Sequence, residues 1–399
     1  REKYDLAAKV GDVVKIVGKA GGIRDNFALY DFVEGVKKQG NKKPIIAINM
    51  GIEGQMSRVL NSTFSPVSHP LLPNKAAPGQ LSFKQIQQAL HLIGLLPSRT
   101  FYLFGNPIQH SMSPTLHNTA FEILGLPHKY ELLETREVGE EIKLAITAPD
   151  FGGASVTIPF KLDVIPLLDR LTPAAEAIGA VNTIVPQAGS VLVGDNTDWI
   201  GIRNVINNKL GSRLGPGSGS GHGAIHAALV IGAGGTARAA IYALQALKAD
   251  VIYLYNRTRS KAEELASLFP DANVKVIGQL ADWAGQGITP PSVIVSTVPA
   301  SATTTEDEEA EHGAGAGAIV LSRALFEYHL GWGVVVDMAY RPAETPLIRL
   351  AKGVGRHWKV VPGLEVLLEQ GYEQFRLWTG RTCPKSLVAR KVWDRYNAV

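Results

Sequence analysis

The chain contains Val230-Ile-Gly-Ala-Gly-Gly-Thr-Ala-Arg-Ala239 at the point where an apolar run gives way to a helix-like one. The apolar run, Ala228–Ile231, is typical of a buried parallel strand. Glycines directly after such a strand allow a tight turn and a close approach of the backbone to a pyrophosphate, whose charge the free N–H groups of the next helix stabilise. The sequence therefore predicts a dinucleotide-binding βαβ unit, with the cofactor held by Gly232, Ala233, Gly234, Gly235, Thr236 and Ala237.

A second predicted strand, Asp250–Tyr255, ends where such a unit distinguishes between its two common cofactors. Units that bind NAD usually have Asp or Glu there, which bonds to the ribose hydroxyls. This chain has Asn256 and then Arg257, whose planar donor fork suits a 2′-phosphate. The sequence therefore predicts NADP as the cofactor, with Thr258 and Lys261 completing this part of the site.

Length and composition fit a large enzyme of two to three domains, because 399 residues with 45% hydrophobic content can form real cores. The net charge of +4 is spread along the chain, so direct nucleic-acid binding has little support. No apolar stretch is long enough to cross a bilayer and no signal peptide opens the chain, so we expect a cytoplasmic location. The single cysteine, Cys383, excludes an intrachain disulfide, and the ten histidines show no paired ligand spacing, so no metal is expected.

Three α/β zones follow one another along the chain. Residues 1–95 alternate strand and helix patterns over about three βα units. Residues 98–208 form a second α/β zone, onto which residues 364–399 are expected to pack back. Residues 224–363 form the dinucleotide-binding domain. The Gly/Ser-rich stretch Gly211–Gly223 is predicted to be a connector, and the acidic, Gly/Ala-rich stretch Thr303–Gly317 a solvated, mobile insertion. The chain begins with Arg1 rather than Met, so we expect it to be part of a longer polypeptide.

The middle zone carries polar residues suited to binding a polyhydroxylated ring. Ser111 and Ser113 stand just before a helix that Pro114 can start, where both can approach one carboxylate. A lysine, Lys161, an amide, Asn182, and a carboxylate, Asp198, each follow a predicted strand. These three types of side chain can bind ring hydroxyls and move a proton from one of them.

These segments resemble those of shikimate dehydrogenases over about residues 100–399. The match includes the sequence Val156-Thr-Ile-Pro-Phe-Lys161 and the segment Asn256-Arg-Thr-Arg-Ser-Lys-Ala262. The resemblance implies a substrate domain followed by a Rossmann NADP domain. It implies that Lys161 and Asp198 are catalytic, and that the substrate-binding residues are Ser111, Ser113, Thr157, Asn182, Tyr340 and Gln370. It also places Thr297, Met338 and Gly363 near the cofactor.

The implied reaction is the reversible reduction of 3-dehydroshikimate to shikimate in the pathway to aromatic amino acids. The hydride comes from NADPH, and Lys161 supplies the proton. The alternative that Lys161 and Asp198 form an ordinary surface ion pair is disfavoured by the motifs around them.

The first zone contains the segments Gly11-Asp-Val-Val-Lys-Ile-Val17, Met50-Gly-Ile-Glu-Gly-Gln-Met-Ser-Arg58 and Lys75-Ala-Ala-Pro-Gly-Gln80. These segments resemble the C-terminal part of type I 3-dehydroquinate dehydratases, which are (βα)₈ barrels. The resemblance implies that Lys15 forms a Schiff base with the substrate ketone, while Arg58 and Gln80 hold its carboxylate. A desolvated Lys15 at a strand end would suit that task. Because about three βα units cannot close an eight-stranded barrel, we expect no dehydratase activity from these residues alone.

A dehydratase tail fused to a shikimate dehydrogenase resembles the C-terminal part of the fungal pentafunctional aromatic-biosynthesis (AROM) polypeptides. It also resembles the fungal quinate-pathway repressors, which sense metabolites and whose partner is a transcriptional activator. A quinate/shikimate dehydrogenase is a third alternative. The exposed strand edges expected in the first zone also allow pairing with a second copy as a homodimer.

Overall fold

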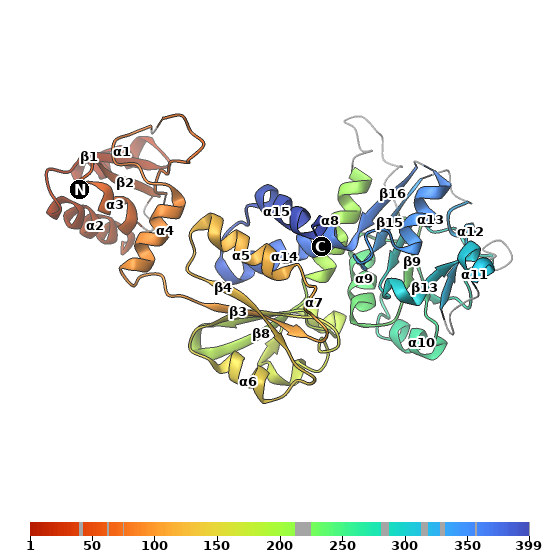
Figure 1. Ribbon diagram of the computed structural model, residues 1–399. Helices are drawn as coiled ribbons and strands as arrows, with labels where there is room; N and C mark the ends of the chain where they lie inside the picture. The colour runs from red at the N-terminus through yellow and green to blue at the C-terminus, as the bar shows by residue number, and fades with distance from the viewer. Residues whose placement is uncertain are drawn as a thin grey trace. The chain divides into compact units, whose positions relative to one another are not determined.

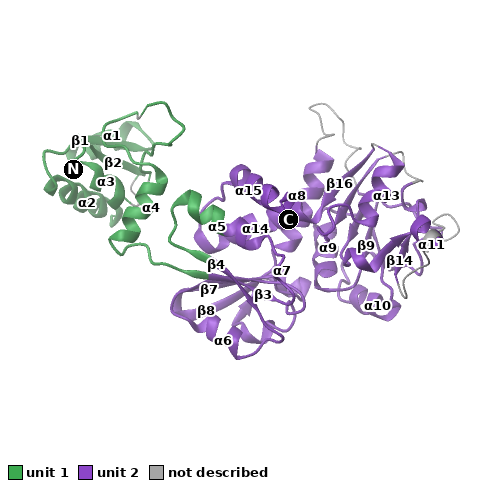
Figure 2. Ribbon diagram, in the orientation of Figure 1, with its two compact units in different colours: residues 1–100, 118–129 green, residues 101–117, 130–399 purple. Residues whose placement is uncertain are grey.

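The computed structural model describes residues 1–39, 43–61, 64–74, 76–211, 225–280, 287–312, 318–327, 332–355 and 357–398. The chain divides into two compact units, which are coloured separately in Figure 2. The first comprises residues 1–100 and 118–129, and the second residues 101–117 and 130–399. The predicted Gly/Ser connector, Gly211–Gly223, lies outside the described residues except for Gly211 itself.

The first unit has a small core around two parallel strands. In β1 and β2, Val14 pairs with Ile45 and Lys19 with Met50. Residues 1–95 were expected to hold about three βα units, but their described part holds only these two strands. The last helix of this zone begins with a capping box. The Ser82 hydroxyl accepts from the backbone N–H of Gln85, and the Gln85 side chain accepts from the backbone N–H of Ser82. The elements are α1 (Glu2–Val10), β1 (Val14–Lys19), α2 (Arg24–Lys37), β2 (Ile45–Met50), α3 (Gln55–Leu60) and α4 (Phe83–Leu92).

A mixed six-stranded sheet follows, with strand order β4-β3-β5-β7-β8-β6. Strand β7 is antiparallel to both β5 and β8, whereas β6 is parallel to β8. Every residue of β5 is buried, which is typical of a central strand covered on both faces. The strands are β3 (Thr100–Gly105), β4 (Lys129–Glu134), β5 (Phe151–Val156), β6 (Arg170–Leu171), β7 (Thr183–Gln187) and β8 (Val191–Asp195), and the helices are α5 (Ser113–Leu124), α6 (Glu140–Thr147), α7 (Pro173–Ile178) and α8 (Asp198–Gly211).

The second six-stranded sheet is parallel, with strand order β11-β10-β9-β12-β15-β16 (Figure 1). Counted along the chain this order is 3-2-1-4-5-6, the order of a Rossmann domain. The predicted α/β class and the dinucleotide-binding fold are therefore confirmed. The strands are β9 (Ala227–Ile231), β10 (Val251–Tyr255), β11 (Val274–Val276), β12 (Val293–Ser296), β15 (Gly333–Asp337) and β16 (Trp358–Pro362), and the helices are α9 (Gly235–Ala246), α10 (Arg259–Ser267), α12 (Ala324–Glu327) and α13 (Pro346–Val354).

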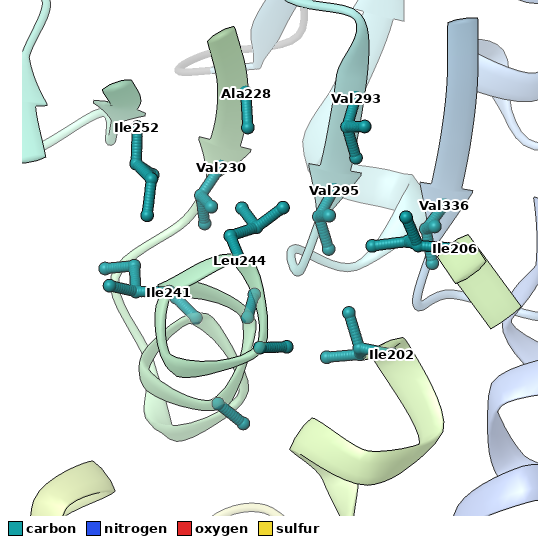
Figure 3. Close-up of a cluster of buried hydrophobic side chains, with 14 of the residues drawn as sticks. Ile202, Ile206, Ala228, Val230, Ile241, Leu244, Ile252, Val293, Val295 and Val336 are labelled. Carbon is teal, nitrogen blue, oxygen red and sulfur yellow. The ribbon is translucent and has the colours of Figure 1, made fainter. Parts of the chain in front are cut away.

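Alternate residues of these strands pack into two separate cores, as the two-residue period of a strand requires. Val230 and Val295 point towards the side chains of α8 and α9, in the cluster drawn in Figure 3. Leu229 and Ile294 belong to the core that includes Leu347 of α13. Burial on both faces explains why these strands are continuous apolar runs in the sequence.

The acidic stretch at 303–317 is more ordered than its composition suggested. Thr303–Thr305 forms β13, which pairs in parallel with β14 (Ile319–Leu321), and Glu306–His312 forms α11. Thr303 and Thr305 are buried, so the prediction of a solvated insertion is wrong for residues 303–305, whereas Glu306 and Asp307 of α11 are exposed as predicted. Residues 313–317 lie outside the described part.

The last two helices are α14 (Gly363–Thr379) and α15 (Lys385–Asn397). The indole N–H of Trp378 donates to the carbonyl of Ile184 in β7, at 3.0 Å. Two glycines allow close packing here. A Cβ at Gly201 of α8 would lie 3.0 Å from the Gln370 side chain, and a Cβ at Gly371 of α14 would lie 2.6 Å from the Leu116 side chain. The chain thus returns from the nucleotide sheet to the substrate sheet. In the described part of the chain, no helix has the length and apolar character needed to span a membrane.

Candidate active site

The glycine turn between β9 and α9 has the geometry of a dinucleotide cradle. Gly232 has a positive φ of 112°, and a Cβ there would lie 2.4 Å from the hydroxyl of Thr297. A Cβ at Gly234 would meet nothing within 4 Å, so the turn is open above this residue. Helix α9 begins at Gly235, and its first N–H groups have no partner within the helix. These residues fit the pyrophosphate of a dinucleotide.

The predicted ribose-side residues follow β10. Asn256 donates its side-chain amide to the carbonyl of Thr258, at 2.9 Å, which shapes the turn before α10. Arg257, Thr258 and Lys261 are exposed on this turn and on the first turn of α10. A guanidinium and an ammonium at this strand end suit a phosphate on the ribose.

A pocket of about 330 Å³ lies within the second unit and is lined from both of its sheets. It brings together all eight predicted catalytic and substrate-binding residues. Of the predicted cofactor residues, Thr236, Thr297, Met338 and Gly363 line it, whereas the other nine lie outside its lining. The substrate-site residues in the lining are Ser111, Ser113, Thr157, Lys161, Asn182, Asp198, Tyr340 and Gln370.

Lys161 and Asp198 form a close, buried ion pair in this pocket. The Lys161 Nζ lies 2.5 Å from the Asp198 Oδ2, and the two residues are 8% and 7% exposed. Strand β5 delivers Lys161 just beyond its end, while Asp198 begins α8, where a helix N-terminus stabilises negative charge. A charge-assisted bond in such a place fixes both side chains in one orientation.

Asn182 connects this pair to the rest of the site. Its Nδ2 donates to Asp198 Oδ1 at 2.8 Å, and its Oδ1 accepts from the backbone N–H of Thr197 at 2.7 Å. Because a backbone N–H can only donate, the amide of Asn182 has one possible orientation. Gln370 accepts hydrogen bonds from Asn182 and Thr197, at 3.3 and 3.1 Å.

The two predicted carboxylate-binding serines lie at the start of α5. The hydroxyl of Ser111 accepts from the N–H of Ser113, at 3.2 Å. Ser111 also bonds to the Tyr340 hydroxyl, and burial raises the pKa of Tyr340 above its ordinary value. Tyr340 is thus a neutral hydroxyl beside the serines.

Sequence reasoning missed two buried polar residues of the pocket, namely Ser155 and Gln374. The Ser155 hydroxyl accepts from Tyr130 at 2.7 Å and donates to Gln374 Oε1 at 2.9 Å. The Gln374 amide then donates to the Asn182 carbonyl and to the Thr183 hydroxyl, at 3.1 and 2.9 Å. The signal in the sequence was the spacing of Gln370 and Gln374, which puts two amides on one face of a mostly apolar helix.

Asp337, at the end of β15, is a buried acid beneath the cofactor side of the pocket. Burial raises its pKa to about 6, while bonds from Thr345, Ala339 and Ser296 oppose that rise. Because the folded-state pKa lies above the unfolded one, the stability that the protonated form contributes is present below about pH 4 and is lost as the pH rises through 6.

We therefore expect the free energy of unfolding of the wild type to fall between about pH 4 and pH 6, by on the order of 2 kcal/mol more than that of Asp337→Asn. The Thr345 hydroxyl, which donates to the carboxylate at 2.6 Å, can reverse its role towards an amide, so the variant should fold. Urea unfolding of both proteins across this range measures the difference. If the free energies of unfolding of the two proteins changed equally between pH 4 and pH 6, the raised pKa of Asp337 would be contradicted.

The dehydratase-like residues lie in the first unit. Arg58 is fully buried and donates to the Pro66 carbonyl at 3.3 Å, and Gln80 donates to the adjacent Val67 carbonyl at 2.9 Å. The Nε and Nη2 atoms of Arg58 are buried with no hydrogen-bond partner in the described part. Lys15, in contrast, is exposed on β1, so the expected desolvated amine is wrong for this unit. No group of three or more metal-ligating side chains occurs among the residues described.

Four family models match successive parts of the chain. They are type I 3-dehydroquinase at residues 1–97, the shikimate dehydrogenase substrate binding domain at 103–184, shikimate/quinate 5-dehydrogenase at 221–317, and the shikimate 5′-dehydrogenase C-terminal domain at 363–392. Together they follow the order predicted from the sequence.

Known relatives agree with this order. A pentafunctional AROM polypeptide of Mycosarcoma maydis is 44% identical over 98% of this chain, and the chain spans 24% of its length. The structure of the dehydroquinate dehydratase and shikimate dehydrogenase of Schizosaccharomyces pombe AROM is 43% identical, with a TM-score of 0.76, over 98% of this chain and 71% of that one. A shikimate 5-dehydrogenase of Thermus thermophilus, solved with NADP(H) and shikimate, is 31% identical, with a TM-score of 0.58, over 75% of this chain and 99% of that one.

The fold and the pocket thus define a two-domain α/β protein of the dinucleotide-binding class, with a pocket lined from both of its sheets. The chain belongs to the shikimate dehydrogenase family, and a type I 3-dehydroquinase region precedes its dehydrogenase part, as in the AROM polypeptides.

Proposed function

We propose that this chain is an NADP-dependent shikimate dehydrogenase that interconverts shikimate and 3-dehydroshikimate. The observation that carries the proposal is the buried Lys161–Asp198 pair, which lies in one pocket with the start of α9. The domains proposed are 98–208 with 364–399 for the substrate and 224–363 for NADP, preceded by a partial dehydratase barrel at 1–95.

The proposed roles follow from the hydrogen-bond capacity of each side chain. The hydroxyls of Ser111 and Ser113 donate hydrogen bonds to the substrate carboxylate, next to the Tyr340 hydroxyl. The ring hydroxyls meet Thr157 and the amides of Asn182 and Gln370, all of which line the pocket. A substrate held at both ends in this way leaves one hydroxyl beside Lys161.

Lys161 takes the proton of the reacting hydroxyl during oxidation and returns it during reduction. Asp198 orients the amine and is itself held by Asn182. Bound NADP⁺ would supply the hydride acceptor for the substrate carbon. The residues that would hold it are the turn from Gly232 to Ala237, the segment from Asn256 to Lys261, and Thr297, Met338 and Gly363, which line the cleft between the sheets.

The choice of NADP over NAD rests on Arg257 in this proposal. Replacing Arg257 with alanine is expected to raise the Kd for NADP⁺ by about 10- to 150-fold, because one charge-assisted hydrogen bond is worth about 1.5–3 kcal/mol. The Kd for NAD⁺ should change by less than about threefold, since NAD⁺ lacks the phosphate.

Calorimetric titration of both nucleotides into the wild type and the variant measures these constants. Arg390→Ala, on the exposed side of α15, is the matched control and should leave both constants unchanged. An equal loss of affinity for NADP⁺ and NAD⁺ would show that Arg257 does not recognise the phosphate.

A steady rate with quinate in place of shikimate would support the quinate/shikimate alternative. No observation supports the repressor alternative or its activator partner. No observation supports a homodimer either. We propose that the first unit has no dehydratase activity by itself, because Lys15 is exposed and the described residues of this unit form a sheet of two strands. A cytoplasmic location remains a prediction.

A further inference from the structure

The first turn of α9 touches the lysine that the proposed reaction needs. The Lys161 Nζ donates to the Thr236 hydroxyl at 3.3 Å, in addition to its bond with Asp198. A Cβ at Gly235 would lie 3.5 Å from Lys161 Cδ and 3.6 Å from the Ala180 side chain, which is ordinary van der Waals contact. The nucleotide turn and the proton-transferring side chain are therefore direct neighbours within the second unit.

The hydroxyl of Thr236 can still donate a hydrogen bond. It accepts from Lys161, and no described residue accepts a hydrogen bond from its own hydrogen. A hydroxyl can accept and donate at the same time. Thr236 is half-buried and is the second residue of α9, so its free hydrogen lies where the turn is fitted to an anion.

We propose that Thr236 is a positioning residue that couples the cofactor site to Lys161 through its hydroxyl. This inference rests on the proposed function. A hydroxyl that donates to a phosphate oxygen becomes a stronger acceptor, since bonds in a chain polarise one another. Lys161 is then held more firmly beside Asp198, in the orientation in which its amine can bond to a substrate hydroxyl. Because coupling between two binding sites is reciprocal, a substrate that orders Lys161 also favours the nucleotide.

The coupling can be measured without turnover. NADPH and shikimate are both reduced, so they form a ternary complex that cannot react. Calorimetry gives the Kd of shikimate with and without saturating NADPH, and the ratio of the two constants is the coupling factor. For the wild type we expect a factor of about 5–50, within the usual range for coupled sites.

In Thr236→Val the factor should fall at least about fivefold towards one, whereas Thr236→Ser should keep the wild-type value, because valine removes only the hydroxyl and serine retains it. The Kd of NADPH alone should rise in Thr236→Val, which loses the bond to the phosphate oxygen, but saturation can still be reached because the pyrophosphate also binds backbone N–H groups. The Kd of shikimate alone should change by less than about threefold, since the proposal gives Thr236 no bond to the substrate. Thr147→Val, on the exposed face of α6, is the matched control and should behave as the wild type. Thermal unfolding of each variant verifies that it is folded, and Thr236→Ala replaces valine if valine prevents folding.

A wild-type coupling factor retained in folded Thr236→Val or Thr236→Ala would overturn the inference, and so would a factor of one in the wild type. Both results leave the proposed function intact if the wild type still oxidises shikimate. Failure of the wild type to bind NADPH or shikimate would refute the proposed function and, with it, the inference.

Discussion

Replacing Lys161 with methionine is expected to lower kcat for shikimate oxidation by about 10²–10⁴-fold, the usual contribution of a positioned proton-transfer group. Methionine matches the length of the lysine stem but cannot accept a proton. Among the described residues, Lys161 is the side chain that forms an ion pair with Asp198, and both residues are buried. Steady-state rates with shikimate and NADP⁺ measure the loss.

Binding should survive this change. The Kd for NADP⁺ is expected to stay within about threefold of the wild type, because the cofactor turn provides its own backbone N–H groups. Lys143→Met, in the exposed pair with Glu140 on α6, is a matched control and should keep full activity. A Lys161→Met enzyme with near-normal kcat would exclude Lys161 from the proton transfer.

Replacing Asp198 with asparagine is expected to lower kcat by about 10²–10³-fold. The carboxylate accepts from Lys161 and from Asn182, and an amide turns an N–H towards at least one of these donors. Lys161 then loses its orientation, although its charge remains. Rate measurements across substrate concentration should show the loss mainly in kcat.

The double variant distinguishes a shared role from two separate ones. Residues that act as a unit have effects that do not add, so Lys161→Met with Asp198→Asn should be within about threefold of Lys161→Met alone. Asp250→Asn, in an exposed pair with His226, is the control for the aspartate change. Fully multiplicative losses would mean that the two side chains act independently.

The nucleotide-binding domain could be predicted from a short stretch because its signal is local. Strand, glycine turn and helix are consecutive, and each glycine has a physical reason, as Gly232 shows with its positive φ beside Thr297. The meeting of Lys161 and Asp198 could be predicted too, since each follows a strand of the same sheet. Resemblance to a known family supplied the individual roles.

The hydrogen bonds that hold the pocket residues in place could not be predicted from a local stretch of sequence. Gln374 is 219 residues from Ser155 along the chain, and only the return of α14 to the substrate sheet brings the two together. The error at residues 303–305 has a similar cause. Composition indicated a solvated segment, but the pairing of β13 with β14 buries Thr303 and Thr305. Both cases are tertiary contacts that override local preference.

The central claim is that Lys161 and Asp198 catalyse NADP-dependent oxidation of shikimate in this pocket. The direct test mixes the purified chain with shikimate and NADP⁺ and follows the near-ultraviolet absorbance of NADPH. We predict steady NADPH formation that requires both compounds and is lost in Lys161→Met. Binding of shikimate, seen by calorimetry, without any NADPH formation by the wild type would contradict the account.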